Sequence, residues 1–285
     1  MQKIWVCGAR GQIGQAVNDV VDKLEFEMLD TDVDDLDVTD TDEVLRFGEM
    51  NRPDIIINCS GMTDIAACEE NPSRAFKVNA LGARNLAIVA AKMQAKMVQL
   101  STDDVFDGKS TEPYTEFDLV NPGTVYGKSK LAGENYVKEF TTKHFIVRST
   151  WVYGKGQNFI SDFLKKVDAG EQLSIASDQF GSPTSAHELA RFLLHLVHTS
   201  EYGTYHATNK GVCSRYAFAQ EILKMTGKTA SMQPVPTVMS DFSKVRPAYA
   251  VLDNFIMSMV PIYDFPDWQD SLREYLEERG LYHAE

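Results

Sequence analysis

Short apolar segments alternate with helical segments through the first half of the chain, and this alternation constrains the fold more than any other feature. The predicted strands are KIWVCG, FEML, DIIINCSG, KMVQLS and HFIVRST, which begin at residues 3, 26, 54, 96 and 144. The helices expected between them span residues 12–23, 42–51, 72–93 and 122–140. Strands that are apolar along nearly their whole length are typical of a parallel sheet covered by helices on both faces. Since βαβ crossovers are right-handed, we predict an α/β fold with a doubly wound parallel sheet.

The alternation becomes less regular after about residue 151. Helical patterns at residues 158–169, 186–198, 214–225 and 267–279 are separated by short extended pieces and by loops that contain proline. We therefore predict a first domain over residues 1–151 and mainly a smaller C-terminal lobe over residues 152–285. Two segments of the second half, roughly 174–200 and 236–254, are expected to return to the first domain.

The composition is that of an acidic globular protein, and the scattered cysteines fit a reducing compartment. A formal net charge of −13 over 285 residues argues against partners such as nucleic acid or an anionic membrane surface. No apolar stretch is long enough to span a bilayer, and the opening residues MQKIWVCGARG do not resemble a secretory signal. The four cysteines show neither CxxC nor zinc-like spacing, and His195 and His198 have no obvious third ligand. We expect a cytoplasmic protein without a metal site.

The segment GARGQIG places Gly8, Gly11 and Gly14 between the first predicted strand and the first predicted helix. Backbone N–H groups can approach a pyrophosphate only where side chains are absent, and a helix N-terminus adds partial positive charge. A glycine-rich turn that serves packing alone is the structural alternative. At this position the motif favours a dinucleotide site, and hence a Rossmann-type sheet.

The acidic run DTDVDDLDVTD, residues 30–40, follows the second predicted strand. The spacing excludes a calcium loop. No starting residue in this run places both the glycine and the final glutamate of such a loop at the positions that calcium binding requires. Asp32 lies about 20 residues beyond the glycine loop, where an acid can bind the adenosine ribose, and Asp30 is the alternative. A 2′-phosphate would be repelled here, with no nearby arginine or lysine to receive it. The cofactor is therefore NADH or NADPH, and the charge favours NADH.

Two further segments carry possible acid–base chemistry. VYGKSKLAGE places Tyr126 and Lys130 four residues apart, on one face of a predicted helix. A neighbouring ammonium stabilises the phenolate and brings the tyrosine pKa toward neutral pH. In LSTDDVFDG, Ser101 or Thr102 follows a strand and could donate a hydrogen bond to a carbonyl group. Each segment alone is also explained by a helix surface or by a hydroxyl-rich turn.

Taken in order, these motifs resemble the extended short-chain dehydrogenase/reductase superfamily, and within it the dTDP-4-dehydrorhamnose reductase family. The resembling stretches also include PDIIINCSGMT, VNALGARNLA, RSTWVYG, DQFGSPT and RPAYAVLDN, so they cover nearly the whole chain. The resemblance implies that Thr102, Tyr126 and Lys130 are catalytic. The positions implied for cofactor binding are Gly8, Gly11, Gln12, Ile13, Gly14, Asp32, Asp37, Val38, Ser60, Gly61, Thr63, Lys130 and Arg148. Those implied for the substrate are Thr102, Asp104, Tyr126 and Trp151, while Ser149 and Thr150 would adjoin the nicotinamide.

The implied activity is reduction of the C4 keto group of a nucleotide-activated 6-deoxyhexose by a nicotinamide cofactor, with a small-molecule nucleotide sugar as partner. Asp104 stands where the family usually has tyrosine, and CSGMT replaces a run of alanines and an aromatic residue. Both departures bear on which sugar is bound. The alternatives are an epimerase or dehydratase of the same superfamily, and a non-catalytic regulatory subunit of the methionine adenosyltransferase beta type. A homodimer is the assembly considered.

Overall fold

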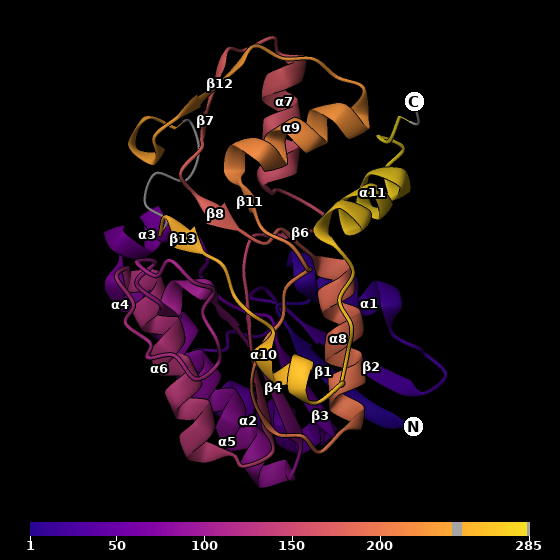
Figure 1. Ribbon diagram of the computed structural model, residues 1–285. Coiled ribbons are helices and arrows are strands. Elements are labelled where there is room, and N and C mark those ends of the chain that lie inside the picture. Colours follow the sequence, from indigo (N-terminus) through magenta and orange to yellow (C-terminus); the bar gives the residue numbers. More distant parts are fainter. Residues whose placement is uncertain (241–246, 284–285) are drawn as a thin grey trace.

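A parallel sheet of six strands forms the centre of the computed structural model, which describes residues 1–240 and 247–283 (Figure 1). The strand order is β10-β5-β4-β3-β1-β2. The strands are β1 (Gln2–Cys7), β2 (Phe26–Thr31), β3 (Ile55–Asn58), β4 (Lys96–Thr102), β5 (His144–Ser149) and β10 (Gly203–His206). The chain moves from β1 to β2 on one side and to β3 on the other, so the order reverses beside β1. Ligands of doubly wound sheets bind at such a reversal, outside the carboxyl ends of the strands.

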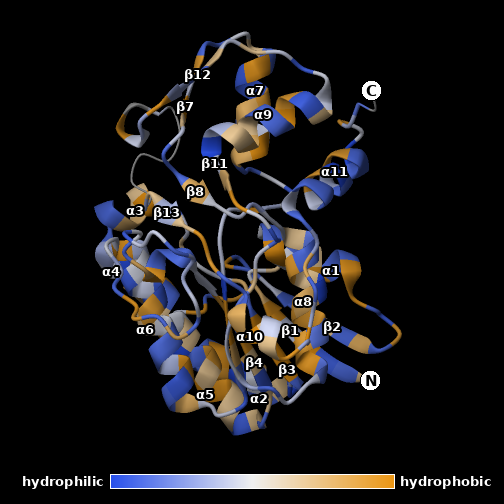
Figure 2. Cartoon of the chain, viewed as in Figure 1, coloured by the Kyte–Doolittle hydropathy of each residue, from blue (hydrophilic) through white to orange (hydrophobic). Residues whose placement is uncertain are grey.

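Helices cover both faces of this sheet, as the apolar strands predict. Alternate residues of β1 point to opposite faces: Ile4 and Val6 pack toward α1 (Gln12–Val20) and α8 (Ala186–His198). Trp5 and Cys7 pack on the other face with residues of α2, α5 and α6. These helices span Thr41–Asn51, Ala83–Met93 and Val125–Phe140. Figure 2 shows the apolar residues concentrated in the central strands. The predicted α/β fold with a doubly wound parallel sheet is confirmed.

The helical segment predicted over residues 72–93 is divided into three parts. Pro72 opens the short helix α4 (Pro72–Phe76), a π-helical segment η1 follows at Lys77–Gly82, and α5 continues from there. A further short helix, α3 (Ile65–Glu70), precedes them. The wider π turn places Asn79 in the interior, where it is 2% exposed. Single π turns inside helices often accompany functional sites.

A smaller lobe carries its own apolar core above the carboxyl ends of the strands (Figure 1). Its helices are α7 (Phe159–Asp168), α9 (Arg215–Thr226) and α11 (Trp268–Glu278). Its short strands pair as β7 (Leu173–Ala176) with β12 (Met232–Val235), and as β8 (Phe180–Gly181) with both β11 (Cys213–Ser214) and β13 (Tyr249–Ala250). The remaining elements are β6 (Val152–Tyr153), β9 (Thr184–Ser185), α10 (Phe255–Met259), η2 (Asp103–Val105) and η3 (Thr237–Met239).

Some of the second half of the chain returns to the central sheet. Helix α8 packs on the same face as α1, and β10 pairs in parallel with β5 at the edge of the sheet. Strand β10 was not predicted to join this sheet, because its four residues give little periodic signal. Residues 241–246, which include part of the predicted returning segment 236–254 and the arginine of RPAYAVLDN, lie outside the described residues. Across residues 1–240 and 247–283, every helix is too short or too polar to cross a bilayer.

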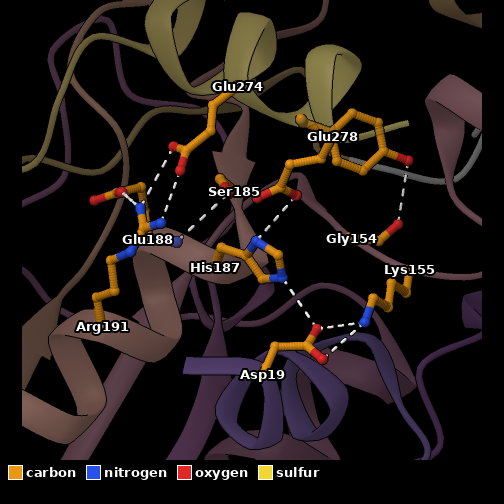
Figure 3. A network of polar contacts seen from close by, with 10 residues as sticks. Asp19, Gly154, Lys155, Ser185, His187, Glu188, Arg191, Glu274 and Glu278 are labelled. Atoms are coloured by element: carbon orange, nitrogen blue, oxygen red, sulfur yellow. Dashed lines mark hydrogen bonds and ion pairs between the residues drawn. The ribbon is translucent and has the colours of Figure 1, made fainter. Parts of the chain in front are cut away.

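Polar contacts through His187 on α8 link the C-terminal helix α11 to α1 (Figure 3). The carboxylate of Asp19 on α1 accepts a hydrogen bond from Lys155 at 2.7 Å and lies 3.2 Å from Nε2 of His187. The other ring nitrogen of His187 lies 3.2 Å from Glu278 on α11. Polar side chains from four distant parts of the sequence therefore meet beside the segment that leads into the lobe.

Candidate active site

Two adjoining pockets lie at the carboxyl ends of the sheet strands. The first has a volume of about 550 Å³ and extends over the glycine loop and the acidic run. The second, of about 470 Å³, lies between the sheet and the smaller lobe. Both are lined by Gly11, Cys59, Ser60 and Gly61, so they form one elongated cleft. Its two-part shape is suited to a dinucleotide followed by a second ligand.

Most of the residues that the sequence implicated line this cleft. They are Gly8, Gly11, Gln12, Ile13, Asp32, Asp37, Val38, Ser60, Gly61, Thr63, Thr102, Tyr126, Lys130 and Trp151, together with Ser149 and Thr150. Gly14, Asp104 and Arg148 lie outside both linings, and so does Asp30, the alternative for the ribose. Gly14 has a packing reason, because a Cβ there would lie 2.4 Å from the carbonyl oxygen of Gly8.

The glycine loop leaves room for a ligand against bare backbone. Gly8 has φ +76°, and a Cβ at this position would lie 2.7 Å from the backbone nitrogen of Ser60. Gly11 is the N-cap of α1 and supplies no side-chain hydrogen bond, so the first N–H groups of this helix face the cleft without a side-chain cap. The loop therefore fits a pyrophosphate, which these N–H groups and the helix dipole would hold.

The acidic run carries a basic partner that the sequence analysis missed. Asp32 accepts a hydrogen bond at 2.9 Å from the backbone N–H of Arg10, which lies within the glycine loop. The Arg10 guanidinium donates to Asp34 at 2.7 Å and to Asp35 at 2.9 Å. The expectation that no arginine or lysine lies near this run is wrong. Arg10 is some twenty residues away in sequence and is brought close because β1 and β2 are neighbours.

Residues from two elements meet in the second pocket. Thr102 is the last residue of β4, and Tyr126 and Lys130 lie one turn apart on α6. Lys130 is buried, and desolvation lowers the pKa of its ammonium to about 8, although the negative charge of Glu134 opposes this shift. Its Nζ would lie 3.8 Å from a Cβ placed on Gly61, so the amine is beside the cofactor half of the cleft. A hydroxyl, a phenol and a buried amine together can polarise a carbonyl oxygen and protonate it.

Asn79, to which the sequence analysis gave no role, orders the loop between the two pockets. Its side chain accepts from the backbone N–H of Met62 at 2.8 Å and donates to the Met62 carbonyl at 3.0 Å. It also donates to the hydroxyl of Ser129 on α6 at 2.9 Å. The segment VNALGARNLA gave a family resemblance here, but the inward position of Asn79 depends on the π turn.

Trp151 forms the wall on the side of the smaller lobe. It has a left-handed backbone at φ +46°, and a Cβ at Gly181 would lie 2.6 Å from its ring. The guanidinium of Arg215, from α9, lies 3.4 Å from the centre of the Trp151 ring. Arg215 also lines the second pocket, where its positive charge would attract an anionic ligand. No sequence motif pointed to this arginine.

Arg148 and Asp104 lie in the interior beside the second pocket. The guanidinium of Arg148 donates to both carboxylate oxygens of Glu134, at 2.9 and 2.8 Å. Asp104 lies in η2 and is 1% exposed. Among residues 1–240 and 247–283, no group of three or more His, Cys, Asp and Glu side chains is placed to hold a metal ion.

Comparison with known proteins gives consistent relatives over the whole chain. The sequence model of the RmlD substrate binding domain family matches residues 1–280. The spore coat polysaccharide biosynthesis protein SpsK of Bacillus subtilis is 35% identical and covers 98% of this chain and 99% of its own. Among solved structures, a dTDP-4-dehydrorhamnose reductase from Clostridium acetobutylicum is 40% identical, with a TM-score of 0.95 over 98% of this chain and 100% of that one. A Bacillus anthracis enzyme of the same name, in complex with NADP, is 35% identical, with a TM-score of 0.93 and the same coverage.

Proposed function

The chain belongs to the dTDP-4-dehydrorhamnose reductase family, and we propose that it reduces the C4 keto group of dTDP-4-dehydro-L-rhamnose to give dTDP-L-rhamnose. The observation that carries the proposal is the meeting of Thr102, Tyr126 and Lys130 in the pocket that adjoins the glycine loop. The product would serve as a precursor of cell-surface polysaccharide. A nicotinamide cofactor bound in the cleft would supply the hydride that reduces the keto carbon.

Side chains of this protein would stabilise and then neutralise the negative charge that develops on the carbonyl oxygen. Tyr126 would donate its phenolic proton to that oxygen, while the Thr102 hydroxyl donates a hydrogen bond to it. Lys130 would hold the cofactor ribose and, as an ammonium, lower the pKa of Tyr126 so that proton transfer is favourable near neutral pH. The glycine loop would orient the pyrophosphate through backbone N–H groups.

The sugar nucleotide would lie against the stacked side chains of Trp151 and Arg215. The indole ring offers a flat apolar surface, and the guanidinium that stacks on it offers positive charge for a diphosphate. Asp104 and the loop that contains Met62 adjoin this region and are proposed to influence which sugar is accepted.

NADH is proposed as the preferred donor over NADPH. Asp32 and Asp37 line the first pocket beside the predicted ribose position, and Arg10, the arginine next to them, is already bound by Asp34 and Asp35. A 2′-phosphate adds nearly two negative charges there. Comparing kcat/KM for the two cofactors tests this proposal, and a clear preference for NADPH would refute it.

The decisive assay combines purified protein, NADH and dTDP-4-dehydro-L-rhamnose, and follows the nicotinamide absorbance while the sugar product is identified. Oxidation of NADH with formation of dTDP-L-rhamnose is expected, and its absence would refute the proposal. An epimerase or dehydratase would show no net consumption of the cofactor. Tyr126→Phe should lower kcat by about 10²- to 10⁴-fold. A non-catalytic regulatory subunit would give no turnover for this variant to lower.

We also infer a cytoplasmic location, in keeping with the four free cysteines.

A further inference from the structure

A fully buried carboxylate lies one helical turn beyond the lysine of the active site. Glu134 is 0% exposed and accepts a hydrogen bond at 2.6 Å from the hydroxyl of Ser101 on β4. Arg148 on β5 binds both of its oxygens. Through this one side chain α6 is attached to the two strands whose carboxyl ends form the floor of the second pocket.

The same carboxylate lies on the face of α6 that carries Lys130. Residues four apart on a helix are neighbours, so Glu134 is the nearest acidic group on this helix to the Lys130 ammonium. The Cys59 thiol, just after β3, also acts on Lys130, and Tyr126 on α6 lines the same pocket. Burial alone would drive this amine toward its neutral form, and a nearby negative charge opposes that tendency.

We propose that Glu134 is a positioning residue for the ketoreduction, which keeps Lys130 in its charged form and fixes α6 against β4 and β5. The inference rests on the function proposed above. It also gives Arg148 a role different from the contact with nicotinamide that the family resemblance implied. Arg148 would stabilise the buried carboxylate so that Glu134 remains ionised, and it would act without touching the cofactor.

Stability alone is a weak explanation for this buried ion pair. Desolvation of two charges offsets most of their attraction, and well-packed apolar side chains are often as stable or more so. Stability alone therefore does not explain a glutamate and an arginine that are both buried, as Glu134 and Arg148 are. The other titratable groups near Glu134 are Lys138, whose Nζ lies 3.7 Å away on a half-exposed side chain, and His206 on the neighbouring strand, whose buried imidazole is uncharged because its pKa is lowered to about 3.

The charge on Glu134 is directly testable through the pH dependence of kcat. Reduction requires a charged Lys130, so kcat should fall as the pH rises through the pKa of this amine. Glu134→Gln removes the opposing negative charge and leaves the Arg148 charge in place. The alkaline fall in kcat should then occur at a lower pH, by on the order of one unit. Glu134→Asp retains the charge and should return the profile to that of the wild type.

A matched control separates this effect from a general loss of stability. Glu188 on α8 is also a buried glutamate that pairs with an arginine, Arg191, and it lies outside the cleft. Glu188→Gln should lower the melting temperature and leave the alkaline limb of kcat unchanged. If Glu134→Gln does not fold, the double variant Glu134→Met with Arg148→Met makes this interior apolar. It should shift the alkaline fall in the same direction but by less, because the opposing charge of Arg148 is removed as well.

Binding of NADH without substrate gives a second readout. Its Kd, measured by calorimetry between pH 7 and 9, should begin to rise at a lower pH in Glu134→Gln than in the wild type. If the wild type is active and Glu134→Gln shows the same pH dependence of kcat and of Kd as the wild type, the role of Glu134 is refuted and the proposed function still stands. A wild type that does not oxidise NADH would instead overturn the proposed function.

Discussion

Replacing Gly133 with alanine would force apart two helical segments whose close contact places Lys130. Gly133 lies on α6, and a Cβ there would be 2.4 Å from the carbonyl oxygen of Asn79 in η1. Ordinary contact begins at about 3.4 Å, so α6 would have to move by roughly 1 Å. The atom that it meets belongs to the backbone and cannot rotate away.

The expected cost has two parts of opposite sign. Overpacking of this kind destabilises by about 1–3 kcal/mol, while alanine is a better helix former than glycine by about 1 kcal/mol. A net loss of about 1 kcal/mol would lower the Tm by roughly 2–4 °C in a chain of this size. The effect on turnover should be larger, because a displacement of about 1 Å at a catalytic group can cost on the order of 10²-fold in rate.

Thermal unfolding and NADH oxidation measured on the same preparation test this prediction. The control is Gly123→Ala, because a Cβ at Gly123 has no neighbour within 4 Å and its φ is outside the left-handed range. We expect the control to retain both Tm and kcat. A Gly133→Ala variant with the Tm and kcat of the wild type would show that α6 does not need this contact.

Three further predictions concern charge. Burial, together with the Arg148 charge, lowers the pKa of His206 to about 3. The stability of the fold should therefore be complete above the unfolded pKa of about 6.5 and fall by up to about 1.4 kcal/mol per pH unit below it. His206→Gln should flatten this slope in urea denaturation at pH 7.5 and 5. Replacing both Asp34 and Asp35 with asparagine should free Arg10 and raise kcat/KM for NADPH relative to NADH. An unchanged ratio would show that the charge of these two side chains does not set the cofactor preference. Arg215→Met should raise KM for the sugar nucleotide by roughly tenfold or more and leave the Kd of NADH unchanged by calorimetry.

Local patterns were sufficient to predict the central strands, the glycine loop and the pairing of Tyr126 with Lys130. Each of these depends on residues within one strand, one turn or one helix, so its signal is contained in a short stretch of sequence. Helix α8 begins and ends at the predicted residues for the same reason. Asp40 caps α2 through a local bond to the N–H of Glu43, and the Glu43 side chain accepts from the N–H of Asp37.

The features that sequence did not predict depend on contacts between distant segments. Arg10 meets Asp34 and Asp35 only because β1 and β2 are adjacent. Asn79 turns inward because of a π turn, which has no short sequence signature. Arg148 pairs with Glu134 on α6, a contact between segments that are distant in sequence, and its predicted role in cofactor binding stays a prediction.

The return of β10 and α8 to the central sheet has a consequence for how the protein is made. During synthesis the first 151 residues leave the ribosome with the edge of β5 unpaired and one face of the sheet lacking α8. An open strand edge beside an uncovered apolar face is prone to pair with other chains. The nascent chain can close its sheet only after residue 206 has emerged. A chain truncated near residue 151 would therefore carry the whole glycine loop and still be expected to aggregate, and one that continues through β10 is the shortest that completes the sheet.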